Sequence, residues 1–238
     1  MKKKIISWLK KQLKDSGAKG MVMGLSGGLD SAVVAALAKE AVGKKGVLAL
    51  LLPCHSQAQD LKDARLVAKW MGIKTKTIDL TKVYDNLWKI LPQAGGLPLA
   101  NLRPRLRMTI LYYFANKFNY LVCGTGNKSE LAAGYFTKYG DGGVDILPIG
   151  DLLKTQVRKL AGEFGIPLSI ISKPPTAGLW PGQTDEGEMG ITYPELDDIL
   201  ERLEHKRRQA LPASKVNKVQ DMVKRSQHKR QGPRICYV

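Results

Sequence analysis

Serine, glycine and aspartate residues are concentrated in one eight-residue segment that could bind an anion. Residues 24–31 read Gly-Leu-Ser-Gly-Gly-Leu-Asp-Ser and stand between an apolar run at 21–25 and a helix-forming run at 32–38. A helix that begins after a glycine-rich turn presents unpaired N–H groups and a partial positive charge, which favour phosphate. The glycines of the turn have no Cβ, so the backbone can lie close to a ligand, and the serines add hydroxyl groups. We therefore expect this segment to hold a phosphate group.

Asp30 places a carboxylate beside the expected phosphates. A cation such as Mg²⁺ between the carboxylate and the phosphates would remove their repulsion. The segment is not a Walker A loop, because that loop has a lysine directly before its Ser or Thr, and here Asp30 precedes Ser31. The alternative interpretation is an ordinary strand-to-helix turn in which Asp30 is a helix-start residue.

A second glycine-rich turn follows another apolar run. Residues 119–123 are expected to form a strand, and Gly-Thr-Gly-Asn-Lys-Ser-Glu at 124–130 leads from it into a helix. If the two strands are neighbours, Glu130 could face Asp30 across one metal ion and give Mg²⁺ two carboxylate ligands. Taken alone, Glu130 is an early-helix acid that the helix dipole favours.

Basic and glycine-rich segments in the second half of the chain have two interpretations each. Three arginines between 103 and 107 could contact an anion or form a solvated basic face. Lys154 is close to the start of a helix expected at 153–164, where a cation opposes the helix dipole, and this position suggests an anionic ligand. The glycine- and aromatic-rich loop at 134–145 is too irregular for a simple connection and is expected to carry function.

The elements that must position these residues alternate between strands and helices. Strands are expected at 46–52 and 74–80, with an amphipathic helix between them at 60–71. This alternation predicts an α/β fold with a Rossmann-like parallel sheet flanked by helices, and the phosphate turn at the carboxyl ends of its strands. Loops are expected at 91–98, 173–182 and 185–188. Further helices are expected from residue 5 to Gly17 with Ile5, Trp8, Leu9 and Leu13 on one face, from the arginine segment to about 117, and at 193–205 and 213–224.

Length and composition indicate a globular protein with a substantial core. The chain has 238 residues, of which 44% are hydrophobic and 25% charged. Its apolar stretches are shorter than the ~20 residues that a membrane span needs, and its basic start lacks the apolar length and the cleavage site of a signal peptide. Three scattered cysteines lack metal-ligand spacing, so we expect reduced thiols and a cytoplasmic location.

The formal net charge of +17 calls for an explanation. It could serve nucleic-acid binding, attract small anionic substrates, or form a solvated surface. Few aromatic residues are interspersed with the basic ones, so no platform for stacking bases is apparent. The charge alone does not decide among these three.

Together, these motifs resemble those of the ammonia-dependent NAD⁺ synthetases, which belong to the PP-loop ATP pyrophosphatases. The PP-loop signature SGGxDS is similar to residues 26–31 and is shared by several families, whereas FTKYGDGG at 136–143 is highly specific for NAD⁺ synthetases. The resemblance extends in order over most of the chain. The matching segments are GLSGGLDS, RLRM, GTGNKSE, GYFTKYGDGGVD, KPPTAGLWPGQTDE, Met-Gly-Ile at 189–191 and His-Lys-Arg at 228–230.

The resemblance implies that the chain makes NAD⁺ from deamido-NAD⁺ (nicotinate adenine dinucleotide), ATP and ammonia, through an adenylated carboxylate. The implied ATP-binding residues are Gly24, Leu25, Ser26, Gly27, Gly28, Leu29, Asp30, Ser31, Thr125, Lys154 and Thr176. The implied Mg²⁺ ligands are Asp30 and Glu130. The implied contacts to deamido-NAD⁺ are Arg105, Lys138, Asp145, His228 and Lys229. As a hypothesis, Asp141 or Asp145 orients ammonia or takes a proton from ammonium.

The same resemblance implies a homodimer and one domain over residues 1–238. The ATP-binding core is expected at about 18–172, with a C-terminal loop and helices at about 173–238. The chain has no room for the glutaminase domain of larger relatives, so free ammonia is the expected nitrogen donor. Gly-Asn-Lys-Ser at 126–129 departs from the Asp-His-Ala-Ala of many bacterial relatives, so contacts of those residues are not carried over.

Two other classes of function remain as alternatives. A PP-loop enzyme that adenylates a tRNA base would suit the charge, but such enzymes lack the FTKYGDGG loop and no RNA-binding domain is apparent, so no specific nucleic acid is expected. A noncatalytic nucleotide-binding module would not need two carboxylates placed for one metal ion.

Overall fold

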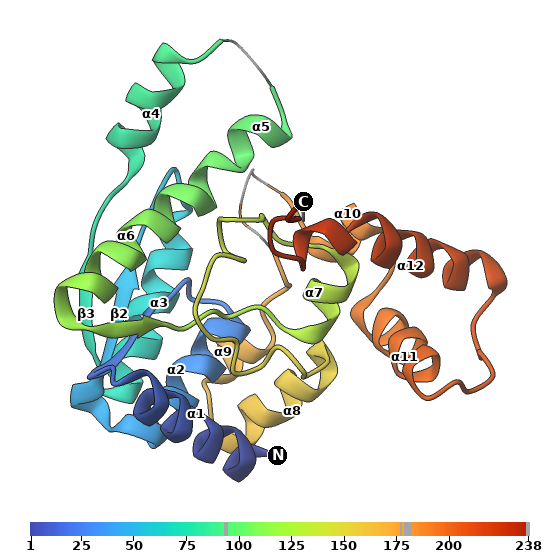
Figure 1. Ribbon diagram of the computed structural model, residues 1–238, viewed down its shortest axis with the longest axis horizontal. Helices are drawn as coiled ribbons and strands as arrows, with labels where there is room; N and C mark the ends of the chain where they lie inside the picture. The colour runs from blue at the N-terminus through green and yellow to red at the C-terminus, as the bar shows by residue number, and fades with distance from the viewer. Residues whose placement is uncertain (93–94, 177, 179–181, 237–238) are drawn as a thin grey trace.

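The structure, a computed structural model, describes residues 1–92, 95–176, 178 and 182–236. Its described part contains a parallel sheet of four strands in the order β3-β2-β1-β4. The strands are β1 (Gly20–Gly24), β2 (Val47–Leu51), β3 (Lys74–Thr77) and β4 (Tyr120–Val122). Helices flank this sheet (Figure 1), and the α/β fold predicted from the sequence is confirmed.

The glycine-rich turn at 25–28 follows β1, the strand at which the chain order of the sheet reverses. The chain passes from β1 to β2 and β3 on one side, and β4 then pairs with the other side of β1. Ligands of open parallel sheets bind beyond the carboxyl ends of the strands at such a switch point. The two glycine-rich turns follow β1 and β4, so the neighbouring strands deliver both of them to this place.

Alternate residues of the strands pack on opposite faces of the sheet. Met21 and Met23 face a core formed with α2 (Leu29–Val42), α3 (Ala58–Met71) and α8 (Lys154–Phe164). Val22 faces a second core formed with α4 (Thr81–Ile90) and α6 (Leu102–Phe118). Both faces are therefore covered, as parallel sheets require.

The N-terminal helix agrees with its sequence pattern. Helix α1 (Lys2–Ser16) ends at Gly17, which has a left-handed conformation with φ 66°. Leu9 is fully buried, and Ile5 and Leu13 pack against the same core. Trp8 lies at the margin of this face, because 38% of its surface stays exposed.

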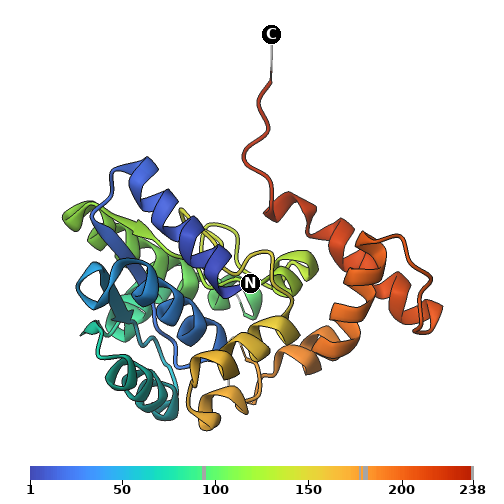
Figure 2. The same ribbon diagram turned by 90° about the horizontal axis from the view of Figure 1, so that it is seen from below.

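The C-terminal helices form a separate layer beside the sheet. Helices α11 (Tyr193–Glu204) and α12 (Ala213–Arg225), both predicted, share a hydrophobic cluster with α7 (Lys128–Ala133). Figure 2 shows that α11 and α12 project to one side of the sheet layer and that the chain end leads away from them. The short helix η2 (Gln227–Lys229) follows α12. The proposed division of the chain near residue 172 stays a prediction.

Several short elements differ from the sequence-based expectations. The acidic run at 185–188 was expected in a loop but forms helix α10 (Asp185–Met189), because the Thr184 side chain accepts a hydrogen bond from the Gly187 N–H and caps it. Part of the loop expected at 91–98 is helix α5 (Leu97–Ala100). Residues 93, 94, 177 and 179–181 of the expected loops lie outside the described residues. Elements that the sequence patterns did not reveal are η1 (Lys44–Gly46), α4 and α9 (Leu168–Ile171).

The edge strand β3 is shorter and more exposed than its alternating sequence predicted. All four of its residues are exposed, and only the flanking Ile73 and Leu80 are buried. In the described ranges, no helix is long and apolar enough to cross a membrane.

Candidate functional site

The turn after β1 is held in shape by its own serines. The Ser31 hydroxyl donates to the Gly28 carbonyl at 3.0 Å and accepts from the Ser26 N–H at 3.3 Å. The Ser26 hydroxyl accepts from the Gly28 N–H at 3.2 Å and lies 3.1 Å from the Ser31 hydroxyl. Helix α2 begins directly after Gly28. The turn thus sets the N-terminus of a 14-residue helix at the switch point, as the sequence predicted.

Gly27 has a conformation and an environment that a side chain would not tolerate. Its φ is 82°, and a Cβ there would lie 2.5 Å from the Asp60 carbonyl oxygen and 2.8 Å from the Ala64 nitrogen. Both of these atoms belong to the backbone of α3, so they cannot move aside. The glycine-rich turn after β1 therefore packs directly on the first turns of α3.

Gly27→Ala should consequently destabilise the protein more than a strained glycine elsewhere. Gly17→Ala is the matched control, because Gly17 has φ +66° and open space around its Cβ position. We expect a loss of about 1–2 kcal/mol in the free energy of unfolding for the control and about 1–3 kcal/mol more for Gly27→Ala. Urea unfolding of both variants measures this, and equal losses would mean that α3 does not restrict the turn.

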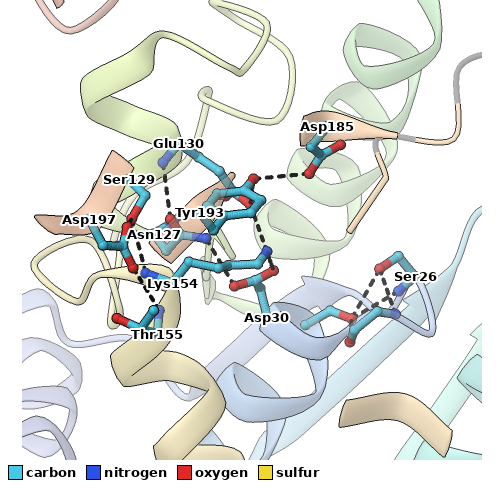
Figure 3. A network of polar contacts seen from close by, with 12 residues as sticks. Ser26, Asp30, Asn127, Ser129, Glu130, Lys154, Thr155, Asp185, Tyr193 and Asp197 are labelled. Carbon is cyan, nitrogen blue, oxygen red and sulfur yellow. Dashed lines mark hydrogen bonds and ion pairs between the residues drawn. The ribbon is translucent and has the colours of Figure 1, made fainter. Parts of the chain in front are cut away.

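Three charged side chains from three helices meet beside this turn (Figure 3). The Lys154 ammonium group, from the start of α8, donates to Asp30 Oδ2 of α2 at 2.5 Å and to Glu130 Oε1 of α7 at 3.0 Å. The side chain of Lys154 is 5% exposed, and each carboxylate side chain is 16% exposed. The two acids that the sequence set 100 positions apart therefore share one cationic group.

Asn127 fixes the relative position of the two acids. Its side chain accepts from the Glu130 N–H at 3.0 Å and caps α7, and the Glu130 carboxylate accepts in turn from the Asn127 N–H. The Asn127 amide also donates to Asp30 Oδ1 at 3.0 Å. Sequence reasoning missed this role, although an asparagine three residues before a glutamate is the pattern of a capping box.

Tyr193, at the start of α11, closes the cluster from the C-terminal side. Its ring centroid lies 4.9 Å from the Lys154 ammonium nitrogen, a favourable position for a cation. Its hydroxyl donates to Asp185 Oδ2 at 3.0 Å and lies 3.5 Å from Glu130 Oε1 (Figure 3). Sequence reasoning missed Tyr193 and Asp185, which no local pattern distinguishes.

Asp197 of α11 and Ser129 of α7 hold the start of α8 in place. The Lys154 N–H donates to the Ser129 hydroxyl at 2.9 Å, and that hydroxyl donates to the Asp197 carboxylate. The other oxygen of this carboxylate accepts from the Thr155 N–H at 2.8 Å. The Asp197 carboxylate interacts favourably with the positive end of the α8 dipole. It thereby offsets the repulsion between this end of the helix and the Lys154 ammonium group.

The electrostatic balance of the cluster still favours additional positive charge. Burial and the Asp30 charge raise the pKa of Glu130 to about 7, although the Lys154 ammonium acts in the opposite direction. Burial alone would lower the pKa of Lys154, but the two carboxylates outweigh it and the pKa of Lys154 is raised. Lys154 is therefore charged at neutral pH, while Glu130 carries its proton part of the time.

The raised pKa of Glu130 predicts how stability changes with pH. An unfolded Glu titrates near pH ~4.3, so between this value and about 7 the folded state binds more protons. Stability from this group therefore falls as pH rises through that window. Glu130→Gln removes the titration, so in metal-free buffer its stability relative to wild type should rise by up to ~4 kcal/mol over the window. Urea unfolding at several pH values tests this, and a constant difference between the two proteins would contradict it.

The other predicted ATP contacts lie on segments around the cluster. Thr125 is partly buried in the turn after β4, beside Gly124, whose N–H donates to the Ile146 carbonyl. Thr176 is exposed, and its hydroxyl accepts from the Gly178 N–H at 3.0 Å.

Three of the residues predicted to contact deamido-NAD⁺ lie in one place. Lys138, His228 and Lys229 lie together, because the Lys138 ammonium donates to the His228 carbonyl at 2.7 Å and to the Gln231 carbonyl at 2.9 Å. Lys229 donates to the carbonyls of Gly134 and Phe136. These lysines join the 134–145 loop to the chain end by backbone contacts, which the sequence did not predict.

Asp141 and Asp145 differ in their surroundings. Both carboxylate oxygens of Asp145 are engaged, Oδ1 by the Tyr112 hydroxyl at 2.9 Å and Oδ2 by the Val122 N–H at 2.7 Å. Asp141 Oδ1 accepts from the Thr137 N–H at 2.8 Å. Asp141 is exposed to solvent, yet protein atoms surround its carboxyl, and the resulting loss of hydration raises its pKa.

The three arginines of α6 have different environments. Arg105 is exposed. Arg107 donates from Nε to the Leu52 carbonyl at 3.0 Å and from a terminal nitrogen to the Ser56 hydroxyl at 3.3 Å, so it supports the segment after β2. The Arg103 guanidinium lies over the Tyr84 ring at 5.2 Å. The interpretation of all three as one basic face is therefore wrong.

Proteins of known family share both the sequence and the fold of this chain. The NAD synthase family model matches residues 1–233. The NH(3)-dependent NAD(+) synthetase of Carboxydothermus hydrogenoformans is 47% identical over 98% of this chain and 95% of its own length. The protein of the same name from Archaeoglobus fulgidus is 48% identical over 99% of this chain and 95% of its own length.

Two solved structures superimpose over nearly the whole chain. The NMN synthetase of Francisella tularensis has a TM-score of 0.91 and 38% identity, covering 100% of this chain and 97% of that one. The NH3-dependent NAD synthetase of Campylobacter jejuni, solved with nitrate, has a TM-score of 0.87 and 30% identity, covering 99% and 97%. The resemblance stated from the motifs is confirmed, and this chain belongs to the NAD synthase family.

Proposed function

We propose that this chain is an ammonia-dependent NAD⁺ synthetase, a ligase that amidates the nicotinate carboxylate of deamido-NAD⁺ at the expense of ATP. The observation that carries the proposal is the meeting of Asp30, Glu130 and Lys154 beside the N-terminus of α2. This arrangement provides cationic and N–H groups for phosphates, with two carboxylates that suit a hard cation. Family membership supports the choice of substrates.

Adenylation would turn a poor electrophile into a reactive one. An oxygen of the nicotinate carboxylate attacks the α-phosphorus of ATP, the bond to the β-phosphate breaks, and pyrophosphate leaves. Ammonia then attacks the adenylated carbonyl carbon, loses a proton, and AMP leaves as the amide forms. This sequence needs no nucleophile from the protein, so the chain's task is to position two anionic substrates and stabilise the charge that develops.

The residues of the cluster have separate parts in this chemistry. Ser26, Ser31 and the first N–H groups of α2 would hold the departing pyrophosphate. The Lys154 ammonium would face the phosphate on which charge develops, and Asn127 and Tyr193 would keep Lys154 and the two acids in place. Thr125 and Thr176 are proposed to contact the rest of the nucleotide.

The donor set fits Mg²⁺ as a cofactor. Mg²⁺ binds through one or two carboxylates and completes its shell with water and phosphate oxygens, and Asp30 and Glu130 both point at one place. Burial and mutual repulsion raise the pKa of Glu130 even beside Lys154, so a further cation would be accommodated favourably. When bound there, the ion would neutralise phosphate charge and favour the departure of pyrophosphate.

The 134–145 loop and the chain end are proposed to form the dinucleotide site, through Arg105, Lys138, Asp145, His228 and Lys229. Lys138 and Lys229 join this loop to the segment that carries His228, and the charge of Lys229 acts on Asp141. We also propose a homodimer in the cytoplasm. The three free cysteines, of which Cys54 and Cys123 are buried, suit a reducing compartment.

A product assay with the purified chain tests the proposal. With ATP, Mg²⁺, ammonium and deamido-NAD⁺ we expect NAD⁺, AMP and pyrophosphate in equal amounts. Glutamine in place of ammonium should give no turnover, and tRNA in place of the dinucleotide should release no pyrophosphate. Pyrophosphate release with tRNA but not with deamido-NAD⁺ would refute the proposed substrate.

A second substrate is favoured by one finding. The Francisella relative with a TM-score of 0.91 is an NMN synthetase, so nicotinate mononucleotide is the competing acceptor for the same amidation. The assay should therefore include this mononucleotide. We expect the dinucleotide to give the higher kcat/KM, and the reverse order would assign the chain to nicotinamide mononucleotide synthesis instead.

A further inference from the structure

Lys173 forms a partly buried ionic contact to which the reaction assigns no role. Its ammonium group donates to Asp60 Oδ1 at 2.8 Å and to Asp63 Oδ2 at 2.6 Å. The side chains are 21% exposed for Lys173, 26% for Asp60 and 11% for Asp63. The Gln59 amide donates to the other Asp63 oxygen at 2.7 Å, which holds the carboxylate in place. The contact joins positions 110 and 113 residues apart in the chain.

One end of this contact lies against the phosphate turn. Asp60 and Asp63 are in the first turns of α3, the part of the helix on which Gly27 packs. A Cβ on Gly27 would lie 2.5 Å from the Asp60 carbonyl oxygen and 2.8 Å from the Asp63 Cβ. A shift of these aspartates would therefore move the backbone that supports Gly27.

The other end begins the segment that carries Thr176. Lys173 follows α9 by two residues, and the Pro175 carbonyl accepts from the Asp185 N–H at 3.0 Å. Beyond Thr176, a Cβ on Gly178 would lie 4.0 Å from Asp60 Oδ2, so this segment remains beside α3. The segment thus runs from the ionic contact with α3 towards the Asp185–Tyr193 side of the charged cluster.

We infer that Lys173 is a positioning residue for ATP, which sets the 173–176 segment at a fixed place relative to the phosphate turn through Asp60 and Asp63. This inference rests on the proposed function, in which the phosphate turn and Thr176 contact the same nucleotide. Lys173 itself touches neither the phosphate turn nor the residues of the charged cluster. Its effect on the reaction is indirect, through the two parts of the protein that it connects.

Two carboxylates face the Lys173 ammonium group in this contact, at 2.8 and 2.6 Å. Burial lowers the pKa of Lys173, but the hydrogen bonds and charges of the two aspartates outweigh this effect and the pKa is raised. The ammonium group is therefore charged at neutral pH. Removing Lys173 leaves two partly buried carboxylates without their counter-charge, so the segment would lose its attachment to α3 in the variant.

The test measures nucleotide binding and kinetics of the full chain with Lys173→Met. We expect the Kd of α,β-methylene-ATP, which the enzyme cannot cleave at that position, to rise about tenfold, with the KM for ATP rising in parallel. The KM for deamido-NAD⁺ should change by less than about twofold, since Lys173 acts on the ATP site alone. A purely structural defect would instead change the KM of both substrates. Lys173→Arg keeps the charge and should recover part of the affinity.

Lys215→Met is the matched control. Lys215 pairs with Glu195 between α12 and α11, away from α3, and its loss should leave the Kd of the analogue unchanged. Asp63→Asn should raise the Kd on its own but add little in the Lys173→Met background, because the two substitutions break one interaction.

Several outcomes would overturn the inference. An unchanged Kd in folded Lys173→Met, or equal rises in the KM of both substrates, would do so. If Lys173→Met does not fold, the milder Asp60→Asn decides, since it keeps the Asp63 contact: a selective rise in the Kd supports the inference and no rise overturns it.

Should the wild-type chain bind the analogue but make no NAD⁺, the proposed function fails while the comparison of variants still stands. A wild-type chain that does not bind the analogue overturns both.

Discussion

Lys154→Met should lower kcat about a thousandfold, the upper range for loss of one group that stabilises developing charge. Lys154 is the one residue in the described part of the chain that contacts both Asp30 and Glu130 through its ammonium group. Without it, two largely buried carboxylates remain close together with no counter-charge. Their repulsion would displace the phosphate site as well as remove the cation.

The same substitution should reduce the free energy of unfolding by about 3 kcal/mol at alkaline pH. The loss should be smaller at acidic pH, because Glu130, whose pKa is already raised to about 7, takes up a proton and the repulsion disappears. Steady-state kinetics and urea unfolding at two pH values measure both effects.

Lys154→Arg is the control, since it keeps the charge but not the shape. We expect Lys154→Arg to retain most of the stability and little of the activity, because a planar guanidinium cannot occupy the same place between the acids and over the Tyr193 ring. A folded Lys154→Met protein with kcat within about threefold of wild type would contradict the role of Lys154 in phosphate chemistry.

Asp141→Asn should lower kcat/KM for ammonia about a hundredfold, the lower range for loss of a general base. The Asp141 carboxyl accepts from the Thr137 N–H, and surrounding protein atoms limit its hydration and raise its pKa, which makes it a better proton acceptor than an ordinary aspartate. Because a protonated carboxyl cannot accept a further proton, wild-type activity should fall as pH decreases through this raised pKa, and Asp141→Asn should lack this dependence.

Asp145→Asn gives the comparison for Asp141. Both Asp145 oxygens accept hydrogen bonds, from Tyr112 and from the β4 backbone, so its loss should affect stability and the KM for deamido-NAD⁺ more than the use of ammonia. Rates measured over a range of ammonium concentrations distinguish the two. If Asp145→Asn alone shows the loss at low ammonium, the roles assigned here are reversed.

The fold was predictable because its signals are local. Apolar runs at β1 and β2, which are buried on both faces of the sheet, predict strands without knowledge of their partners. Helices α1 and α3 end at Gly17 and Gly72, whose left-handed conformations the sequence indicates. The short helices α9 and α10 escaped prediction, because four or five residues give no periodicity and their ends depend on neighbouring segments.

The candidate site was predictable only in part. The two glycine-rich turns, with Asp30 and Glu130 near the helix starts, were identified from residue types and spacing. The contributions of Tyr193 and Lys173 were not, because each acts on residues that lie far away in the sequence. The capping of α7 by Asn127 follows a local pattern, but its hydrogen bond to Asp30 does not. No local pattern distinguishes such a lysine from one on a solvated surface.

By itself, the sequence determined the residue types that are available: a helix start that suits a phosphate, two acids that suit one cation, and the family to which they belong. The order of the strands decided the rest. Because β4 pairs with β1, the turns that follow them meet, and Lys154 contacts an aspartate 124 residues away. Such contacts depend on which strands are neighbours and on how helices cover them, and hydrophobic burial sets both over the whole chain rather than within any one segment.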